Sequence, residues 1–330
     1  MSRTLGRRSL VSVLSIALTG SAAGHAQQSM RRVGILTNLD QDDPETRRRL
    51  GAFEQGLREQ GWVIDRNMRF EYRWGVGDAE SHRRNAADMA ASRPDVILAH
   101  GSTIMGPLQR ATRTIPIVFV SVADPIAGGF ASSLARPGGN ATGFMSFDYG
   151  QSGKWMELLR DLVPGLSRVA VIRDPEQVSG GGQLGALQAV ASVLRIQFVP
   201  IGVRDMNEIE RILTDFAARP NGGLIVTTAA WAQIHRHELV ALATRLRIPA
   251  VYPYRLFVAI GGLCCFAPNI VEQYRQAASY VDRILRGANP ADLPIQAPAK
   301  YEVVVNLKAA AALGIAMSPN LLMRIDETIE

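Results

Sequence analysis

Polar residues follow several apolar, strand-like runs of this chain, and the chemistry of these residues suits binding. The clearest run is FVSVADPIAGG (119–129), where Asp124-Pro125 and two glycines end an apolar stretch. In open α/β sheets, ligands bind beyond the carboxyl ends of the strands. The candidate ligand-binding residues are therefore the polar ends of such runs, which are Thr37, Asn38, Ser102, Thr103, Asp124, Pro125, Asp174, Pro175, Thr227, Thr228 and Tyr252.

The residue types at these strand ends suit a small polar ligand. Ser102 and Thr103 open a predicted helix, whose free amide groups favour an anionic group. Asp124 suits a cationic or polyhydroxylated group; the alternative is a turn residue that is hydrogen-bonded locally, because Asp-Pro is also common in turns. The aromatic residues that can stack on a ligand ring, or pack within the protein instead, are Tyr252, Tyr254 and Trp231.

Signatures of catalysis are absent from the sequence, which has no G-x-S-x-G, H-E-x-x-H or G-x-x-x-x-G-K-[ST] motif. His235 and His237 are two residues apart on a predicted helix and point to different faces, so they are not placed to share a metal. His82 lies in an arginine-rich stretch and is expected to be solvated. His100 ends a strand in the predicted cleft, as a ligand contact or a structural residue. We predict a protein with no catalytic residues and no metal.

One glycine motif, GGGQLG (180–185), fits G-x-G-x-x-G by position. In a dinucleotide site the glycines turn directly out of a strand, whereas here residues 175–179 intervene. The segment is therefore predicted to be a flexible loop that lines the cleft and opens a helix, and no cofactor is predicted.

Strand-like runs alternate with amphipathic stretches, which is typical of parallel α/β sheets. After the strand 33–38, Asp43 and Pro44 suit the start of a helix to about residue 60. Strands are then predicted at 70–74, 96–102 and 115–122, with helices ending near 92 and 112.

The strand pattern then starts again. RVAVIRDPE (168–176) parallels RVGILTNLD (32–40), LIVTTAAW (224–231) parallels VILAHGST (96–103), and RIPAVYPY (247–254) parallels TIPIVFVS (114–121). Three matches in the same order indicate an α/β protein of two similar lobes, each with a doubly wound parallel sheet and with a ligand cleft between them.

The N-terminus has the order of a signal peptide: three arginines, an apolar core at 10–18 and small residues before a cleavage site after Ala26. We predict export to the periplasm without a lipid anchor, by the general or the twin-arginine route. Loss of residues 1–26 removes three arginines and no acid, and lowers the formal charge from +6 to +3. Basic residues are interspersed with acids, so no nucleic-acid partner is predicted. The adjacent pair Cys264-Cys265 excludes a disulfide scaffold.

The chain resembles the substrate-binding proteins of ABC transporters, in the family whose better-known members bind tryptophan, tyrosine and related amino acids. The resemblance rests on five segments, which are GAFEQGLREQGW (51–62), ATRTIPIVFVSVADPIAGGFASSLARPGGNATG (111–143), KWMELLRDLVPGLSRVAVIRDP (154–175), GGLCCFAPN (261–269) and YVDRILRGANPADLPIQAPAKYEVVVNLKAAAALGI (280–315).

This resemblance implies a periplasmic-binding type I fold with three crossovers. Residues 31–142 and 270–297 would form lobe one, and residues 143–269 and 298–330 lobe two. GNATGF (139–144) and GGLCCFAPN would be crossovers, with the glycine pairs 138–139 and 261–262 as hinges. Asn269 joins the candidate ligand-binding residues. Family members often carry Asp-Tyr where this chain has Pro268-Asn269, and a polar Asn-Ser segment where it has the triglycine.

The implied function is that of a monomer that captures a small polar or amino-acid-like solute by hinge closure. It would deliver the solute to a membrane permease that works with its ATPase. The alternatives are a ligand-binding module for a sensor or chemoreceptor, and an exported α/β enzyme.

Overall fold

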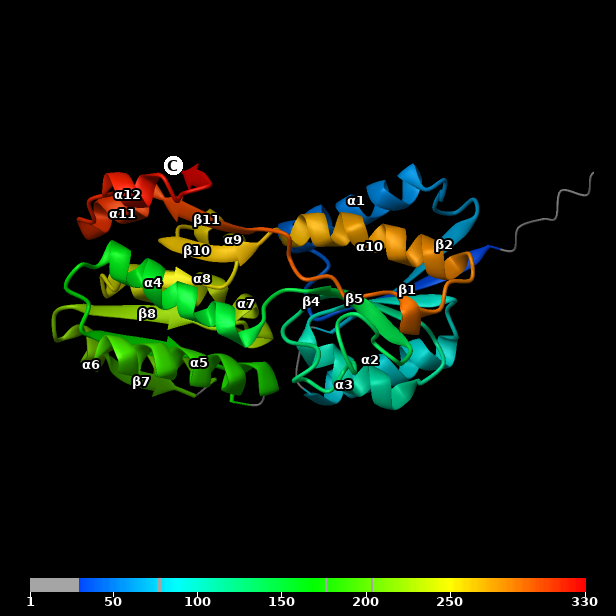
Figure 1. Cartoon of the computed structure of the whole chain (residues 1–330), viewed down its shortest axis with the longest axis horizontal. Helices are drawn as coiled ribbons and strands as arrows, with labels where there is room; N and C mark the ends of the chain where they lie inside the picture. The colour runs from blue at the N-terminus through cyan, green and yellow to red at the C-terminus, as the bar shows by residue number, and fades with distance from the viewer. Residues whose placement is uncertain (1–29, 76–78, 176, 203) are drawn as a thin grey trace, which may run out of the picture.

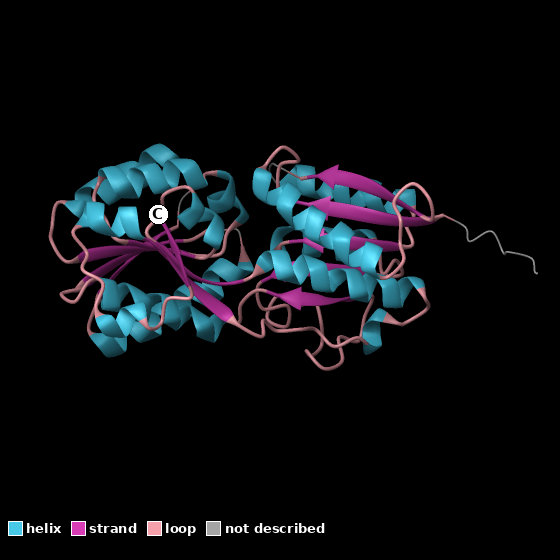
Figure 2. Cartoon of the chain, turned by 90° about the horizontal axis from the view of Figure 1, so that it is seen from above, coloured by secondary structure: helices cyan, strands magenta, loops and turns pink. Residues whose placement is uncertain are grey.

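The structure, a computed structural model, describes residues 30–75, 79–175, 177–202 and 204–330. The predicted signal peptide lies outside these residues. Two lobes, each built around its own sheet, stand side by side (Figures 1 and 2). This confirms the predicted α/β fold of two parallel-sheet lobes.

Lobe one holds a five-stranded parallel sheet with the order β2-β1-β3-β4-β5. Helices α1 and α10 lie together on one face, and α2 and α3 on the other (Figure 1). The elements are β1 (Arg31–Thr37), α1 (Pro44–Glu59), β2 (Met68–Trp74), α2 (Ala79–Ser92), β3 (Val96–His100), α3 (Ser102–Ala111), β4 (Ile117–Val122), β5 (Ala141–Met145), α10 (Ile270–Leu285) and η2 (Pro290–Asp292).

Local sequence explains the first helix of this lobe. The Asp43 side chain accepts a hydrogen bond from the Glu45 amide at 2.8 Å, and Pro44 occupies the first turn, where its missing N–H costs nothing. Phe53 and Leu57 are buried on one face, as the spacing predicts.

Lobe two holds a seven-stranded sheet with the order β12-β11-β10-β9-β8-β6-β7. The part β7-β6-β8-β9-β10 repeats the order of lobe one, which confirms the internal repeat. The elements are η1 (Tyr149–Ser152), α4 (Gly153–Leu162), β6 (Arg168–Ile172), α5 (Val178–Leu194), β7 (Gln197–Ile201), α6 (Met206–Ala217), β8 (Gly222–Val226), α7 (Ala230–Ile234), α8 (Arg236–Arg245), β9 (Ala250–Tyr252), α9 (Arg255–Ala259), β10 (Cys264–Pro268), β11 (Tyr301–Asn306), α11 (Leu307–Leu313), α12 (Pro319–Leu322) and β12 (Glu327–Ile329).

The first crossover lies later in the chain than predicted, whereas the second and third lie at the predicted boundaries near residues 269 and 297. The segment GNATGF (139–144) is not a crossover, because residues 141–144 belong to β5, which pairs with β4 in lobe one. The predicted lobe boundary at residue 142 would divide this strand. GGLCCFAPN contributes β10 to the second sheet. The chain changes lobe at residues 146–148, at Asn269 and at 297–300. β10 leads out of lobe two and β11 leads back in, so these two strands pair antiparallel.

The predicted hinge glycines are also misplaced. Gly138 lies in a turn before β5 and Gly261 in a turn before β10, each inside one lobe. Both have positive φ, 78° and 105°, so a tight turn explains why glycine stands there.

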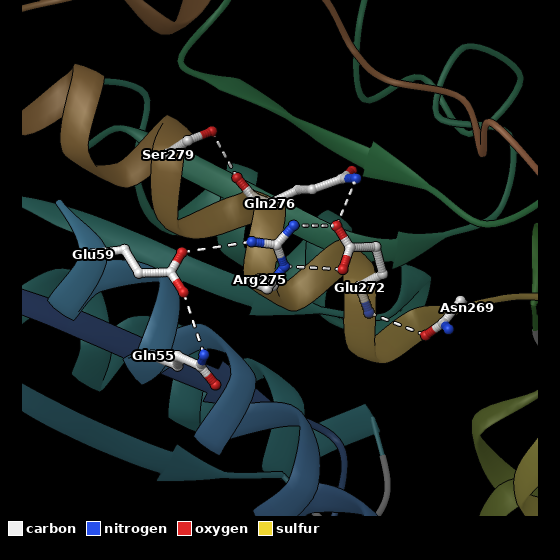
Figure 3. A network of polar contacts seen from close by, with 7 residues as sticks. All are labelled: Gln55, Glu59, Asn269, Glu272, Arg275, Gln276 and Ser279. Atoms are coloured by element: carbon white, nitrogen blue, oxygen red, sulfur yellow. Dashed lines mark hydrogen bonds and ion pairs between the residues drawn. The ribbon is translucent and has the colours of Figure 1, made fainter.

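A polar network links α10 to α1 on lobe one (Figure 3). Arg275 binds Glu272 within α10, at 3.0 Å, and reaches Glu59 of α1 at 3.5 Å. Asn269 caps α10 by accepting a hydrogen bond from the Glu272 amide at 3.1 Å. The second crossover therefore runs directly into a helix that is anchored on lobe one.

No helix among the described residues is long and apolar enough to span a bilayer.

Candidate functional site

A cleft of about 400 Å³ opens where the carboxyl ends of the strands of the two lobes meet. Its lobe-one wall comes from α2, α3 and the segment after β4, and its lobe-two wall from η1 and the loops after β6 and β7. The lining residues are Ala79, His82, Arg83, Ser102, Thr103, Gly106, Pro107, Arg110, Ala123, Gly128, Phe130, Tyr149, Asp174, Gln177 and Arg204.

A niche of about 20 Å³ adjoins the cleft and shares Ser102, Thr103, Ala123 and Gln177 with it. A space of this size holds one water molecule or one small polar group. Its further lining residues are Asn38, Gly101, Ser121, Thr228, Ala229, Ala230, Gln233 and Tyr254.

The N-terminus of α3 points its free amides at the niche. Gly101, at φ 88°, precedes the helix and no side chain caps it. Ser102 Oγ accepts a hydrogen bond from the Ala123 amide at 3.0 Å, and Thr103 Oγ1 accepts one from Asn38 Nδ2 at 3.2 Å. The uncapped first turn and the two hydroxyl groups can therefore hold an anionic group, as the sequence suggested.

Asn38 is the buried acceptor beside that turn. Its side chain is 2% exposed, and its Oδ1 has no hydrogen-bond partner among the described residues. Leaving a buried polar atom unpaired costs free energy, so Oδ1 suits a donor that arrives with a ligand. A group that carries N–H or O–H next to an anionic group would satisfy both Asn38 and α3.

The end of β4 is irregular where it meets the cleft. The pairing with β5 shifts register at Ser121, which has φ 57°, and Asp124 follows with φ 37°. The Asp124 carboxylate accepts a hydrogen bond from the Ala127 amide at 3.0 Å, as a turn residue does. Burial, and secondarily the charge of Asp124, raises the pKa of the nearby Tyr149. Asp-Pro thus closes a turn beside the cleft, and Ser121 is turned into the niche.

Lobe two contributes hydrogen-bonded polar groups. Asp174 is 3% exposed, accepts a hydrogen bond from Gln177 at 3.1 Å and lies 3.8 Å from Arg204. The amide and hydroxyl of Thr228 both donate to Gln183, at 3.0 and 2.9 Å. These contacts hold the lobe-two wall in one arrangement.

The triglycine segment lies within α5 and is not a loop. A Cβ atom on Gly182 would lie 2.1 Å from the Tyr149 ring, and one on Gly180 would lie 2.6 Å from the Asp174 carbonyl oxygen. The glycines therefore let two cleft-lining residues lie against the helix.

Other predicted residues lie outside both cavities. Thr37 accepts a hydrogen bond from the Leu39 amide, and Thr227 donates one to the Ile172 carbonyl. Tyr252 stacks on Phe257 in the core of lobe two. Pro125 is buried in the turn, Pro175 is exposed, and Asn269 caps α10.

His100 faces away from the cleft. Its Nε2 lies 3.4 Å from Arg49 of α1, and its ring lies against Tyr274 of α10. Burial, followed by the charge of Arg49, holds the pKa of His100 well below its usual value. The histidine is therefore neutral and structural.

Sequence reasoning missed several cleft-lining residues. His82, expected to be solvated, is 8% exposed, and its Nε2 donates to the Gly75 carbonyl at 2.8 Å. Tyr149 follows the first crossover, and Phe130 follows the Asp-Pro turn. The position of Phe130 just after that turn was the one available signal. Arg83 and Arg110 lie on helices and Arg204 lies in the loop after β7, and the sequence gives no indication that any of them faces a cleft.

The lobes also touch beside the niche. Arg236 of α8 contacts Asp43 of lobe one at 2.5 Å, and these side chains are 16% and 11% exposed. Arg236 also donates to the carbonyl of Gln233, which lines the niche. This ion pair therefore joins the lobes next to the niche, outside the lining of both cavities. Among the described residues, no group of three His, Cys, Asp or Glu side chains could hold a metal ion.

The comparisons with known proteins agree with this architecture. A family model described as ABC transporter substrate binding protein matches residues 33–329. The chain belongs to this family. A curated relative, the tyrosine-binding protein of Clostridioides difficile strain R20291, is 23% identical over 268 residues, which are 79% of this chain and 75% of the relative.

Solved structures show the same fold as this substrate-binding protein. A conserved domain protein from Vibrio cholerae has a TM-score of 0.84 at 22% identity, and covers 91% of this chain and all of its own. An ABC domain in complex with L-Trp from Streptococcus pneumonia has a TM-score of 0.83 at 20% identity, with the same coverage.

Proposed function

We propose that the protein is the periplasmic component of an ABC importer that captures a small amino-acid-like solute. It acts as a monomer without a catalytic step and delivers the solute to a permease that works with its ATPase. The observation that carries the proposal is the cleft between two lobes, with the uncapped α3 and the unpaired Asn38 Oδ1 at its inner end.

The polar groups of the niche and of the adjoining end of the cleft suit the head group of an amino acid. The amides of α3, with Ser102 and Thr103, would bind the carboxylate. Asn38 Oδ1 would accept a hydrogen bond from the ammonium group, and the negative charge of Asp124, in the turn beside the cleft, would attract it. Two similar proteins support this class of solute. The Clostridioides difficile relative is named a tyrosine-binding protein, and the Streptococcus structure is a complex with L-Trp.

Closure of the lobes would provide the signal for the permease. A solute shifts the equilibrium toward the closed form only if it binds that form better. The Asp43–Arg236 ion pair forms only when the lobes meet, so it would stabilise the closed form together with the solute. The segments at 146–148, Asn269 and 297–300 would be the hinges, and the order of residues at the N-terminus supports export.

A thermal-shift screen tests the proposal. The chain from Gln27 onward would be unfolded and refolded to remove any carried solute, then tested with amino acids, aromatic acids, purines, sugars and small peptides. We expect a rise in melting temperature with amino-acid-like compounds that grows with concentration as linkage requires. A rise with sugars or purines alone would contradict the amino-acid assignment. Turnover of a compound that depends on a cleft residue would contradict the non-enzymatic role.

A further inference from the structure

The cleft outside the niche carries an excess of positive charge. Arg83 of α2, Arg110 of α3 and Arg204 of lobe two all line it. Asp174 is the one carboxylate among its described lining residues, and Gln177 and Arg204 lie beside it. A solute in this space therefore meets three guanidinium groups, one of which has a carboxylate beside it within the cleft.

Arg110 is placed for a ligand and has no ionic partner in the described part of the chain. Its Nη1 lies 3.5 Å from where a Cβ atom on Gly106 would stand, one helical turn earlier. Gly106 and Pro107 line the cleft themselves, so the guanidinium lies along the cleft-facing side of α3. Arg83, in contrast, is held by Glu80 at 2.5 Å in an exposed pair.

The surroundings strengthen the effect of this charge. Phe130 and the ring of Tyr149 supply apolar walls to the same cleft. Low-dielectric walls lined by charges of one sign concentrate the electric field within a cleft. The planar guanidinium groups also match an oxyanion with two parallel hydrogen bonds.

We infer that the solute carries a second anionic group, a carboxylate or a similar oxyanion, at the end distant from its head group. The inference rests on the proposed function, in which the head group lies at the niche end of the cleft. Arg110 binds the distal group, and Arg83 and Arg204 add to the attraction. The solute is thus an acidic, ring-bearing amino acid or acid, whose apolar middle lies against Phe130 and Tyr149.

Two matched pairs of probes test this inference by calorimetry on the refolded chain from Gln27. One pair is L-phenylalanine and 4-carboxy-L-phenylalanine. The other is 3-phenylpropanoate and 3-(4-carboxyphenyl)propanoate, which lack the amino group. We expect the distal carboxylate to strengthen binding by about tenfold or more, the effect of one charge-assisted hydrogen-bonded contact. The gain should shrink when salt is raised, because the site is open to solvent.

The variant Arg110→Gln should remove most of this gain, measured as the ratio of the two affinities within each pair of probes. Arg211→Gln, which changes an exposed arginine on α6 outside the cleft, is the matched control and should keep the gain. Because Arg110 also lies in the last turn of α3, unfolding is measured for each variant, and a folded protein that lost only the gain supports the inference.

The outcomes separate the inference from the proposed function. If L-phenylalanine or 3-phenylpropanoate binds as well as its carboxylated partner, the second anionic group is refuted while solute binding stands. An unchanged gain in Arg110→Gln refutes the role of this arginine. If none of the four probes binds, the amino-acid-like solute class fails, and the inference fails with it.

Discussion

Substituting Gly182 by alanine should damage the cleft, although alanine is ordinarily the better residue inside a helix. Gly181 and Gly182 are neighbours in α5, so both pay the same entropic cost of glycine in a helix. They differ in what an added Cβ atom would meet. At Gly181 there is nothing within 4 Å, whereas at Gly182 the Tyr149 Cε2 atom is 2.1 Å away.

The magnitudes follow from these two environments. Gly181→Ala should stabilise the protein by about 0.5–1 kcal/mol, which raises the melting temperature by about 1–4 °C. Gly182→Ala has the same gain in helix propensity, but the Tyr149 ring has to move, and overpacking of this kind costs about 1–3 kcal/mol. Because Tyr149 lines the cleft, its displacement should also weaken solute binding by about tenfold.

Urea unfolding and calorimetry with the solute measure both effects. The double variant Gly182→Ala/Tyr149→Ala removes the ring, so the unfavourable stability effect of Gly182→Ala should disappear in that background. If Gly182→Ala is as stable as Gly181→Ala and binds the solute equally well, the packing of Tyr149 on α5 is wrong.

Three further predictions concern other contacts. Arg236→Gln removes the ion pair with Asp43, so the closed form should lose about 1.5–3 kcal/mol and the dissociation constant of the solute should rise about tenfold or more. An unchanged dissociation constant in calorimetry would show that the pair does not stabilise closure. The pKa of His100 is lowered in the folded protein, so its contribution to stability is complete above the unfolded pKa of about 6.5 and is lost as pH falls below that value. Urea unfolding at several pH values should therefore show a smaller loss of unfolding free energy in acid for His100→Gln than for the wild type, and an equal loss would contradict this. Asp124→Asn keeps an acceptor for the Ala127 amide but removes the negative charge, so solute binding should weaken about tenfold with little loss of stability. If calorimetry gives the wild-type affinity, Asp124 is a turn residue only.

The strands and the repeat could be predicted because burial on both faces of a parallel sheet demands apolar runs. Val169 and Val33 both stand in such runs, and both strands form as expected. The turn residues were equally informative, since Asp43 and Pro44 do begin α1. The first crossover could not be placed, because an extended segment such as 141–145 has the same residue types whether it pairs in a sheet or joins two lobes.

The cleft was predictable only at the strand ends. Ser102, Thr103 and Asn38 follow strands whose position the fold determines, and they meet as expected. Arg110 lies on the polar side of a helix, where a residue that faces a cleft looks like any solvated residue. The triglycine was misread as a loop because glycine has a low helix propensity. Tertiary packing against Tyr149 and Asp174 outweighs that preference, and a sequence does not reveal such a contact.

Small-angle X-ray scattering of the refolded protein, with and without the solute that the screen identifies, tests the central claim most directly. The claim is that the lobes close on a solute held between them. We predict a larger radius of gyration without the solute, and scattering at saturation that matches the arrangement in which Asp43 contacts Arg236. Identical scattering in the two conditions, with the solute shown to be bound, would contradict capture by closure of the lobes.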